Sequence, residues 1–472
     1  MDPLILLFIG MGVVLGSILL LRMHAFLALL LAALVVGSLT TDAHLEEYAA
    51  SLDPPLSPAA TQTLLLQPLG ERLALGFGRT CAGIGLLIAM ASIIGKSLLE
   101  AGAAHRIVRT SVRILGEERS SVAFLGSGYL LGIPVFFDTV FYLLIPLAKA
   151  MATRIERHYT LYLMCIVAGT TMTHSLVPPT PGPLFAADFL GVDLGTMILC
   201  GLAVGAVTSF GGYLYAVWAN RRWPTPIRGT PDISLAELRT LATKKDDELP
   251  PFWLSVLPIL LPVVLIAGST VGGQVIDSGD LPGLARQLGD KNVALALGAA
   301  VALGMLWHQT RAGLRALAKS VENALLSAGT IILITGMGGA FGIMLQHTAI
   351  GPRIQDLMGG AHSWILPLAF FLTALIRTAL GSATVAMFTA VPILAAFADP
   401  AVLGFHPVWL AMAIGCGSKP FPWMNDSGFW VICRMSGMTE AETLKTTSMT
   451  IAVEGLIGLP TVMVLSNLFP LI

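Results

Sequence analysis

One stretch constrains the fold of this chain more than any other. HSLVPPTPGP, residues 174–183, lies inside a mostly apolar run of about thirty residues, 159–189, which is long enough to cross a bilayer. Its last six residues include four prolines. Because each proline removes a backbone donor and clashes with the preceding turn, a helix cannot continue through them. The chain must therefore unwind inside the membrane, which is tolerated only where backbone is buried in protein or lines a polar cavity.

A second apolar run, 407–434, is interrupted in the same way. The sequence SKPFPWMNDSGF, residues 418–429, places prolines, a glycine and several polar side chains in its middle. Two interrupted segments at corresponding places in two halves of a chain indicate the binding site of a secondary transporter. We therefore expect the two broken stretches to meet and to form one site.

The composition places the whole chain in a membrane. Of its 472 residues, 55% are hydrophobic and 12% are charged, about half the charged fraction of soluble domains. The net charge of −1 gives no reason to expect nucleic-acid binding. The five cysteines form no CxxC pair and are predicted to be core residues, and no cofactor or metal site is expected. An all-α polytopic membrane protein is predicted, and its first apolar run is expected to be a span rather than a signal peptide.

The apolar runs outside the interrupted regions predict continuous spans. A linker is expected at 40–79, with an interfacial helix near 64–75, and an amphipathic surface helix is expected at 105–119. The small-residue sequence GMGGAFG at 336–342 predicts close helix packing. The predicted spans are 3–21, 25–39, 80–99, 194–219, 252–271, 292–307, 321–347 and 446–469.

Two further apolar regions are each broken near the middle. Residues 120–151 contain Gly132-Ile133-Pro134, and residues 362–398 are broken at 381–384. The arms of 120–151 are too short to cross a bilayer comfortably. We therefore predict two re-entrant hairpins, the first with its tip at 132–138. For this first region, two short kinked spans are the alternative.

The breaks in the two halves correspond at one shift of 247 residues. This shift places Gly95 on Gly342, Pro134 on Gly381, and 178–181 on 425–428. It predicts a first repeat at 1–219, with two scaffold spans, hairpin 120–151 and broken helix 159–189. A cytoplasmic connector follows at 220–251. The second repeat is 252–472, with hairpin 362–398 and broken helix 407–434.

Basic residues predict the orientation of the repeats, since cytoplasmic loops carry excess Lys and Arg. If 105–119 lies inside, the cytoplasmic segments hold 19 of the 27 Lys and Arg residues and the outside loops hold five. The result is ten crossings, both termini outside, and hairpins that open to opposite sides, the first to the cytoplasm. The two repeats are therefore predicted to be inverted.

The predicted chemistry at the breaks is anion binding. Each resumed half-helix begins inside the membrane, where its free N–H groups and positive dipole end favour an anion. Thr180 and Ser427 lie just before the resumed helices, where their hydroxyls either cap the helix or bind a ligand. The candidate substrate-binding residues are Gly132, His174, Thr180, Arg377, Gly381, Ser382, Thr384, Asn425 and Ser427.

Charges in these apolar runs are functional candidates, because a charge at bilayer depth is costly unless it is paired or solvated. Arg377 either clamps a substrate carboxylate or forms a structural pair with an acid. Asp138 either carries a proton or caps the hairpin tip, and Asp426 either contacts ligand or caps the resumed helix. The candidate proton-coupling residues are Asp138, His174 and Asp426. Asp188 and Lys419 are weaker candidates, because both side chains can reach the interface.

These stretches resemble the gluconate:proton symporter (GntP) family, within the ion-transporter superfamily of inverted-repeat carriers. The resemblance is carried by GIPVFFD at 132–138, HSLVPPTPGP, GSATVA at 381–386 and NDSGFW at 425–430, in the family's order across nearly the whole chain. The chain has Leu380 where the family often has Gln, and Pro422-Trp423 in a region where it often has Ser-His. The resemblance implies uptake of a sugar acid or a small hydroxy or amino acid with protons. It also implies a scaffold, a moving transport core and homodimers.

The sequence therefore predicts a secondary active transporter in the inner membrane of a bacterial cell. Its expected activity is proton symport of gluconate or a related small hydroxy carboxylate, by elevator-type alternating access. An enzyme is not expected, because the chain has no HExxH or GxSxG pattern. A sodium-coupled carboxylate symporter and a cation/proton antiporter are the alternatives.

Overall fold

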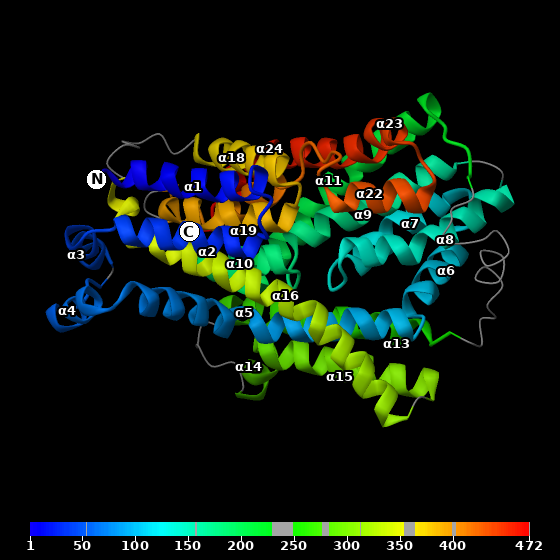
Figure 1. Ribbon diagram of the computed structural model, residues 1–472. Coiled ribbons are helices and arrows are strands. Elements are labelled where there is room, and N and C mark those ends of the chain that lie inside the picture. The colour runs from blue at the N-terminus through cyan, green and yellow to red at the C-terminus, as the bar shows by residue number, and fades with distance from the viewer. Residues whose placement is uncertain are drawn as a thin grey trace.

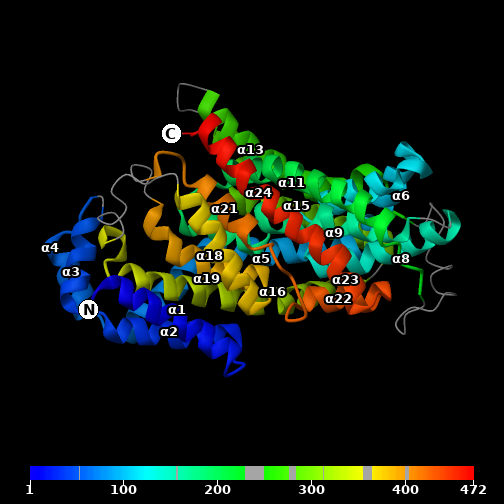
Figure 2. The ribbon, with the colours of Figure 1, turned by 90° about the horizontal axis from the view of Figure 1, so that it is seen from above.

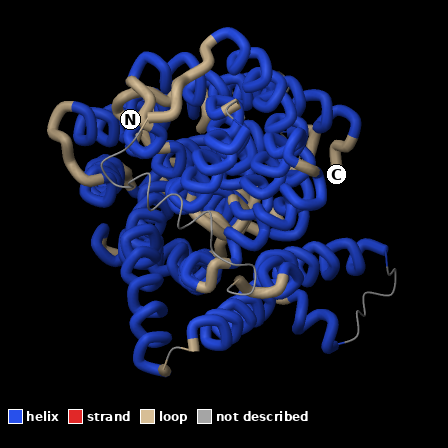
Figure 3. The backbone as a smooth tube through the Cα atoms, turned by 90° about the vertical axis from the view of Figure 1, so that its right-hand side faces the viewer, coloured by secondary structure: helices blue, strands red, loops and turns tan. Residues whose placement is uncertain are grey.

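The computed structural model of the chain is helical (Figures 1 and 3). It describes residues 1–52, 54–155, 158–228, 249–275, 283–311, 313–353, 364–398 and 403–471. Every regular element in these ranges is a helix, which confirms the predicted all-α class. Both chain termini lie toward the same end of the molecule, on the left of Figures 1 and 2.

Two long helices form the centre of one group. α5 (Leu69–Glu100) packs along α16 (Leu314–Gln346). A Cβ atom on Gly339 would lie 1.9 Å from Thr80 Oγ1, and one on Gly336 would lie 2.7 Å from Cys81 Sγ. The glycines of GMGGAFG therefore allow the close packing that the sequence predicts. The helices around this pair are α1 (Pro3–Leu19), α2 (Ala25–Leu39), α13 (Phe252–Val275), α14 (Gly283–Gly289) and α15 (Lys291–Thr310).

A second group surrounds α9 (Tyr159–Leu176). Seven helices in the described residues are long and apolar enough to span a membrane. α9, taken with the helix that follows its break, is the most buried of them, with 94% of its apolar window inside the protein. α7 approaches it so closely that a Cβ on Gly169 would lie 2.2 Å from the Leu125 carbonyl oxygen. The other members here are α6 (Ala103–Leu115), α7 (Ser120–Leu131), α8 (Phe137–Ile155), α10 (Pro181–Phe189) and α11 (Leu194–Arg222).

The C-terminal helices pack against this second group. α24 lies on α11, α21 and α9, and α19 lies on α10. A short π-helical turn, Leu444–Ser448, precedes α24. The helices are α18 (Ile365–Leu380), α19 (Ala383–Leu394), α21 (Val408–Gly417), α22 (Ser427–Ser436), α23 (Glu440–Thr443) and α24 (Met449–Leu468).

All four predicted interruptions are present. α9 and α10 are separated at 177–180, and Pro181 occupies the first helical position of α10, where its missing N–H costs nothing. α21 and α22 are separated at 418–426. α7 and α8 are joined by a turn at 132–136, and α18 ends at Gly381, whose φ of +75° favours glycine. The α18–α19 pair and the α7–α8 pair lie in opposite halves of the molecule (Figure 1).

The predicted linker at 40–79 is longer than the one in the structure. α5 begins at Leu69, so the last part of the predicted linker, 69–79, belongs to the long helix. The linker instead contains α3 (Asp42–Ser51) and α4 (Pro58–Leu66), and the interfacial helix expected near 64–75 falls across the break at Gln67. Basic side chains such as Arg72 and Arg79 do not interrupt α5, because a long helix can hold charges near its ends.

The number of crossings stays a prediction. Among the residues described, seven helices are long and apolar enough to span, and a bent pair, Ala25–Leu39 with Asp42–Ser51, raises the number to eight. α1 has 17 residues and α2 has 15, so the first two of the ten predicted crossings are short. The amphipathic segment is helical, as predicted, in α6. Most of the predicted connector, 229–248, lies outside the described residues.

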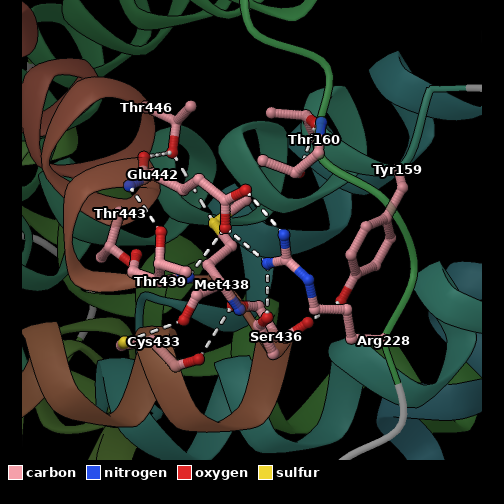
Figure 4. A network of polar contacts seen from close by, with 12 residues as sticks. Tyr159, Thr160, Arg228, Cys433, Ser436, Met438, Thr439, Glu442, Thr443 and Thr446 are labelled. Atoms are coloured by element: carbon pink, nitrogen blue, oxygen red, sulfur yellow. Dashed lines mark hydrogen bonds and ion pairs between the residues drawn. The ribbon is translucent and has the colours of Figure 1, made fainter.

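A network of polar contacts joins α9 to the C-terminal helices, near the start of the predicted connector (Figure 4). Arg228 donates from Nη1 to the Gly437 carbonyl oxygen at 2.9 Å and binds both carboxylate oxygens of Glu442, at 2.5 and 2.9 Å. Beside it, the Tyr159 hydroxyl donates to the Ser436 carbonyl oxygen at 2.7 Å. This network therefore joins the start of α9 to the end of α22 and the start of α23.

Candidate functional site

Both broken stretches and both hairpin turns line one cavity of about 440 Å³. This volume lies within the range of small-molecule sites. Side chains from 136–139 and 382–385 come from the two turns, and those from 174–181 and 418–429 come from the two breaks. The breaks therefore meet, as the sequence predicts. Seven of the candidate residues line the cavity: Asp138, His174, Arg377, Ser382, Thr384, Asp426 and Ser427.

Arg377 is a buried cation in the lining of this cavity. It lies in the last turn of α18 with 4% of its surface exposed. Its Nε donates to the Ser418 carbonyl oxygen at 3.1 Å, and its Nη2 forms an ion pair with the Asp426 carboxylate. Its Nη1 is buried and has no partner among the described residues. The guanidinium is thus fixed by two contacts and keeps one donor nitrogen unused.

Asp426 has two structural partners. Besides its ion pair with Arg377, its Oδ1 accepts from the Gly428 backbone N–H at 2.8 Å, so it caps α22. This contact is the capping role that the sequence left open. Ser427 follows as the first residue of α22, and its side chain is exposed.

Asp138 lies opposite, in the first turn of α8. A Cβ atom on Gly428 would lie 3.7 Å from Asp138 Oδ1 and 3.3 Å from Asp426 Oδ1. The start of α22 therefore brings two carboxylates from different halves of the chain to one place. Like charges so close repel each other, which favours a neutral form for one of them.

His174 occupies the last turn of α9, directly before the first break. Its ring lies edge-on to Phe136, with 5.9 Å between ring centroids. Its Nδ1 is buried and, within the described ranges, has no hydrogen-bond partner. An imidazole nitrogen in this state can bind either a proton or a ligand hydroxyl.

Four candidate residues lie outside the cavity lining and make close contacts elsewhere. A Cβ on Gly132 would lie 2.3 Å from Thr173 Oγ1, so this glycine permits α7 to approach α9. The Thr180 hydroxyl donates to the Val177 carbonyl oxygen at 2.7 Å. Asn425 Nδ2 donates to the Thr378 carbonyl oxygen at 2.8 Å, and a Cβ on Gly381 would lie 2.2 Å from the Asn425 carbonyl oxygen. These contacts hold the turns and breaks in position.

Of the two weaker candidates, Asp188 and Lys419, only Lys419 lines the cavity. Asp188 lies away from the cavity, and a Cβ on Gly83 of α5 would lie 2.6 Å from its Oδ1. Lys419 lines the cavity and is only 4% exposed. The sequence made Lys419 a weaker candidate because its side chain can reach the interface. The chain turns at the break, however, and points the lysine inward.

Other polar residues of the site were missed. Thr171, Ser327, Ser418 and Ser448 line the cavity, and Glu454 lies behind Thr171. Serines and threonines are common in apolar helices and give no distinct signal. Glu454 did have a recognisable sequence signal, since it is a lone acid within the predicted span 446–469.

The sequence also matches a known family along most of its length. The profile described as GntP family permease matches residues 56–468. The chain belongs to the GntP family of permeases.

Relatives of this GntP permease include named transporters. It is 30% identical to the gluconate permease of Pseudomonas aeruginosa, over 94% of this chain and 93% of that protein. It is 28% identical to a high-affinity gluconate transporter of Escherichia coli, over 97% of each chain. An uncharacterized permease of Haemophilus influenzae is 30% identical, over 93% of this chain and 87% of that protein.

Solved structures share the fold. The YdaH transporter of Alcanivorax borkumensis superposes with a TM-score of 0.61 at 16% identity, over 95% of this chain and 100% of that one. MtrF of Neisseria gonorrhoeae, described as an antimetabolite efflux pump, gives a TM-score of 0.57 at 16% identity, over 84% of each chain. At this identity, the two structures support the fold and not the substrate.

Together these findings confirm that the GntP permease is a transporter and not an enzyme. A further relative, 29% identical over 83% of this chain, is named an inner membrane permease of Escherichia coli. With seven helices long and apolar enough to span a membrane in the part of the chain that the structure describes, the expected multi-pass location in a bacterial inner membrane is confirmed.

Proposed function

We propose that this permease is a proton symporter that takes up gluconate or a related sugar acid. The observation that carries the proposal is the convergence of two breaks and two hairpin turns on one cavity that contains Arg377 and Lys419. A small hydroxylated carboxylate matches this lining, because it needs cationic donors at one end and hydroxyl partners along the rest. The names of the gluconate-transporting relatives support the same substrate class.

The substrate carboxylate is placed between the two cations. Arg377 has an unused buried donor, Nη1, on a guanidinium already oriented by Ser418 and Asp426. Lys419, which also lines the cavity, adds a second positive charge. Charge-assisted bonds of this kind are the stronger class of hydrogen bonds.

The substrate hydroxyls are assigned to the polar side chains of the same lining. The donors and acceptors for them are Ser382, Thr384, Ser427 and His174. Thr180, Asn425, Gly132 and Gly381 keep the breaks and turns in place through their contacts.

Proton coupling is assigned to Asp138. An anion entering the cavity meets the Asp138 and Asp426 carboxylates, which converge at the start of α22. Asp426 is neutralised by Arg377, whereas Asp138 lines the cavity without an ion-pair partner among the described residues. Protonation of Asp138 removes the repulsion between its carboxylate and the substrate. Substrate and proton are therefore expected to bind together.

The movement that exposes the site alternately is assigned to one group of helices. In an elevator, α7–α11 and α18–α24 form the transport core, and α1, α2, α5, α13, α15 and α16 form the scaffold. An inverted repeat, 1–219 and 252–472, is supported by the helix bounds. When the residue numbers of α5 are shifted by 247 they become 316–347, which nearly coincides with α16 (Leu314–Gln346). The same shift turns α10 into 428–436, which nearly coincides with α22 (Ser427–Ser436). The scaffolds of two copies are proposed to form a homodimer.

The proposal is tested by uptake into proteoliposomes. Labelled gluconate, glycerate and D-serine are supplied under an inward proton gradient, an inward Na⁺ gradient, or neither. Accumulation of gluconate or glycerate driven by the proton gradient alone is expected. Accumulation that needs Na⁺ identifies a sodium-coupled symporter instead. Proton release without any carboxylate uptake identifies a cation/proton antiporter.

A further inference from the structure

A carboxyl group lies fully buried directly behind the cavity. Glu454 of α24 is 0% exposed, and the only hydroxyl within hydrogen-bond distance of its Oε2, among the described residues, is that of Thr171 at 2.7 Å. Thr171 itself lines the cavity. A single hydroxyl group therefore connects the buried carboxyl to the space in which substrate is proposed to bind.

The hydrogen bonds of Thr171 indicate whether the Glu454 carboxyl is protonated. Thr171 Oγ1 lies 2.7 Å from Glu454 Oε2 and 2.9 Å from the Val167 carbonyl oxygen, and the hydroxyl has one hydrogen to donate. With an ionised Glu454, one of these two contacts lacks a hydrogen. With a protonated Glu454, both are satisfied, because Glu454 donates to Thr171 and Thr171 donates to Val167. The geometry thus fits the neutral acid.

The rest of the surroundings agree with this assignment. Glu454 Oε1 is buried and has no partner within the described part of the chain. On the α11 side it faces Gly212, where a Cβ would lie 3.0 Å from Oε1. An ionised carboxylate left with an unpaired buried oxygen is costly in an apolar setting.

A positive charge near Glu454 favours its ionised form. It belongs to Lys419, in the break after α21, and the other titratable group on this side is Cys416, in the last turn of α21. α24 packs tightly there, since a Cβ on Gly455 would lie 2.9 Å from the Lys419 Cβ. α9 and α11 face it with Thr171 and Gly212, which do not ionise. The ammonium group of Lys419 stabilises the carboxylate after a proton leaves, so the site supports both forms.

We propose that Glu454 is a second proton-binding site of the permease, loaded from the cavity through the Thr171 hydroxyl. Each sugar-acid anion is then carried with two protons, one on Asp138 and one on Glu454. This inference rests on the proposed proton symport and extends it to the number of protons and the second carrier.

The charge balance of transport follows directly. A monovalent anion with two protons moves one net positive charge, whereas the same anion with one proton is electroneutral. At a gradient of one pH unit and zero membrane potential, each coupled proton contributes about a tenfold accumulation of substrate. Two protons therefore give about 100-fold and one proton about tenfold.

The experiment compares wild type with E454Q in proteoliposomes, with gluconate as the probe. Wild type is expected to produce an inward positive current on adding gluconate, and E454Q to lose this current and accumulate about tenfold less per pH unit. The matched control is E322Q, at an exposed glutamate of α16 paired with Lys319 at 3.0 Å, which is expected to behave as wild type. An electroneutral wild type, or an E454Q protein with the wild-type current, overturns the inference. A wild type that accumulates no substrate under a proton gradient instead overturns the proposed symport.

A spectroscopic measurement covers the case in which E454Q does not fold. The infrared carbonyl band of a protonated buried carboxyl is recorded at neutral pH in wild type and in D138N, which removes the other candidate proton carrier. The band is expected to persist in D138N and to shift in T171V, because Val cannot accept a hydrogen bond from Glu454. Absence of the band from D138N overturns the assignment.

Discussion

Arg377 and Asp426 form an ion pair between the first arm of the second hairpin and the second broken helix. The arginine is 4% exposed and the aspartate side chain 15%, so the pair is shielded from solvent. Asp426 also caps α22, and Arg377 also holds the Ser418 carbonyl oxygen. The pair therefore fixes the geometry of the break and leaves Arg377 Nη1 for a ligand.

Replacing Arg377 is expected to weaken carboxylate binding. In R377A, gluconate affinity should fall by at least tenfold, because a hydrogen bond to a charged group contributes about 1.5–3 kcal/mol. R377K is expected to lie between wild type and R377A, since lysine keeps the charge but not the guanidinium geometry. Equilibrium binding of labelled gluconate to purified protein measures both. Wild-type affinity in R377A would show that Arg377 serves only as the structural partner of Asp426.

Asp138 is expected to determine part of the response to pH. In D138N the side chain stays neutral, so one proton is lost from the coupling and accumulation falls about tenfold for each pH unit of gradient. The effect is measured as the steady-state ratio of internal to external gluconate at several imposed gradients. The E322Q protein serves as the control for the neutralisation of an acid at an exposed position. Full accumulation in D138N would refute the proton role.

The sequence predicted the two breaks because several prolines fall close together there and each removes a backbone donor, whereas single prolines such as Pro146 of α8 and Pro460 of α24 stay within a helix. The orientation of side chains at the breaks depends on where the chain turns, which periodicity does not encode. Thr180 and Asn425 therefore bond to nearby carbonyl oxygens, although their positions suggested ligand contacts. Lys419 points inward for the same reason.

The missed beginning of α5 has a different cause. Hydropathy identifies the part of a helix that lies in lipid, and charged residues such as Glu71 and Arg79 lower it. The helix itself continues through them, because Glu and Arg are good helix formers. A prediction based on hydropathy therefore omits the part of a long helix that extends beyond the apolar layer.

Gly381 is expected to tolerate no side chain. Its φ is +75°, and a Cβ would lie 2.2 Å from the Asn425 carbonyl oxygen. Gly404 is a matched control, since its φ is +69° and no atom lies within 4 Å of its Cβ position. G404A should cost about 1–2 kcal/mol for the left-handed conformation, and G381A should cost more and also lose transport. Thermal unfolding in detergent and gluconate uptake measure the two effects. Equal losses in the two variants would contradict the contact with Asn425.

The Arg228–Glu442 pair is expected to contribute modestly to stability (Figure 4). Its side chains are 38% and 26% exposed, so solvent weakens the interaction, although two parallel contacts improve its geometry. A double-mutant cycle with R228A and E442A should give a coupling of about 0.5–1 kcal/mol that decreases with added salt. The Lys319–Glu322 pair, 63% and 58% exposed, should give a smaller coupling in the same assay. A larger coupling for the more exposed pair would run against this account.

Alanine substitutions at two glycines of α16 distinguish the effect of close packing on stability from the effect of helix propensity. A Cβ on Gly339 would lie 1.9 Å from Thr80 Oγ1 of α5, whereas one on Gly329 meets no atom within 4 Å. G329A is expected to stabilise the protein by up to about 1 kcal/mol, because alanine favours a helix interior. G339A gains the same propensity but forces the two helices apart, at a cost of about 1–3 kcal/mol. Thermal unfolding of both variants decides the point. If G339A were as stable as G329A, α5 and α16 would not be in the close contact that holds the proposed scaffold together.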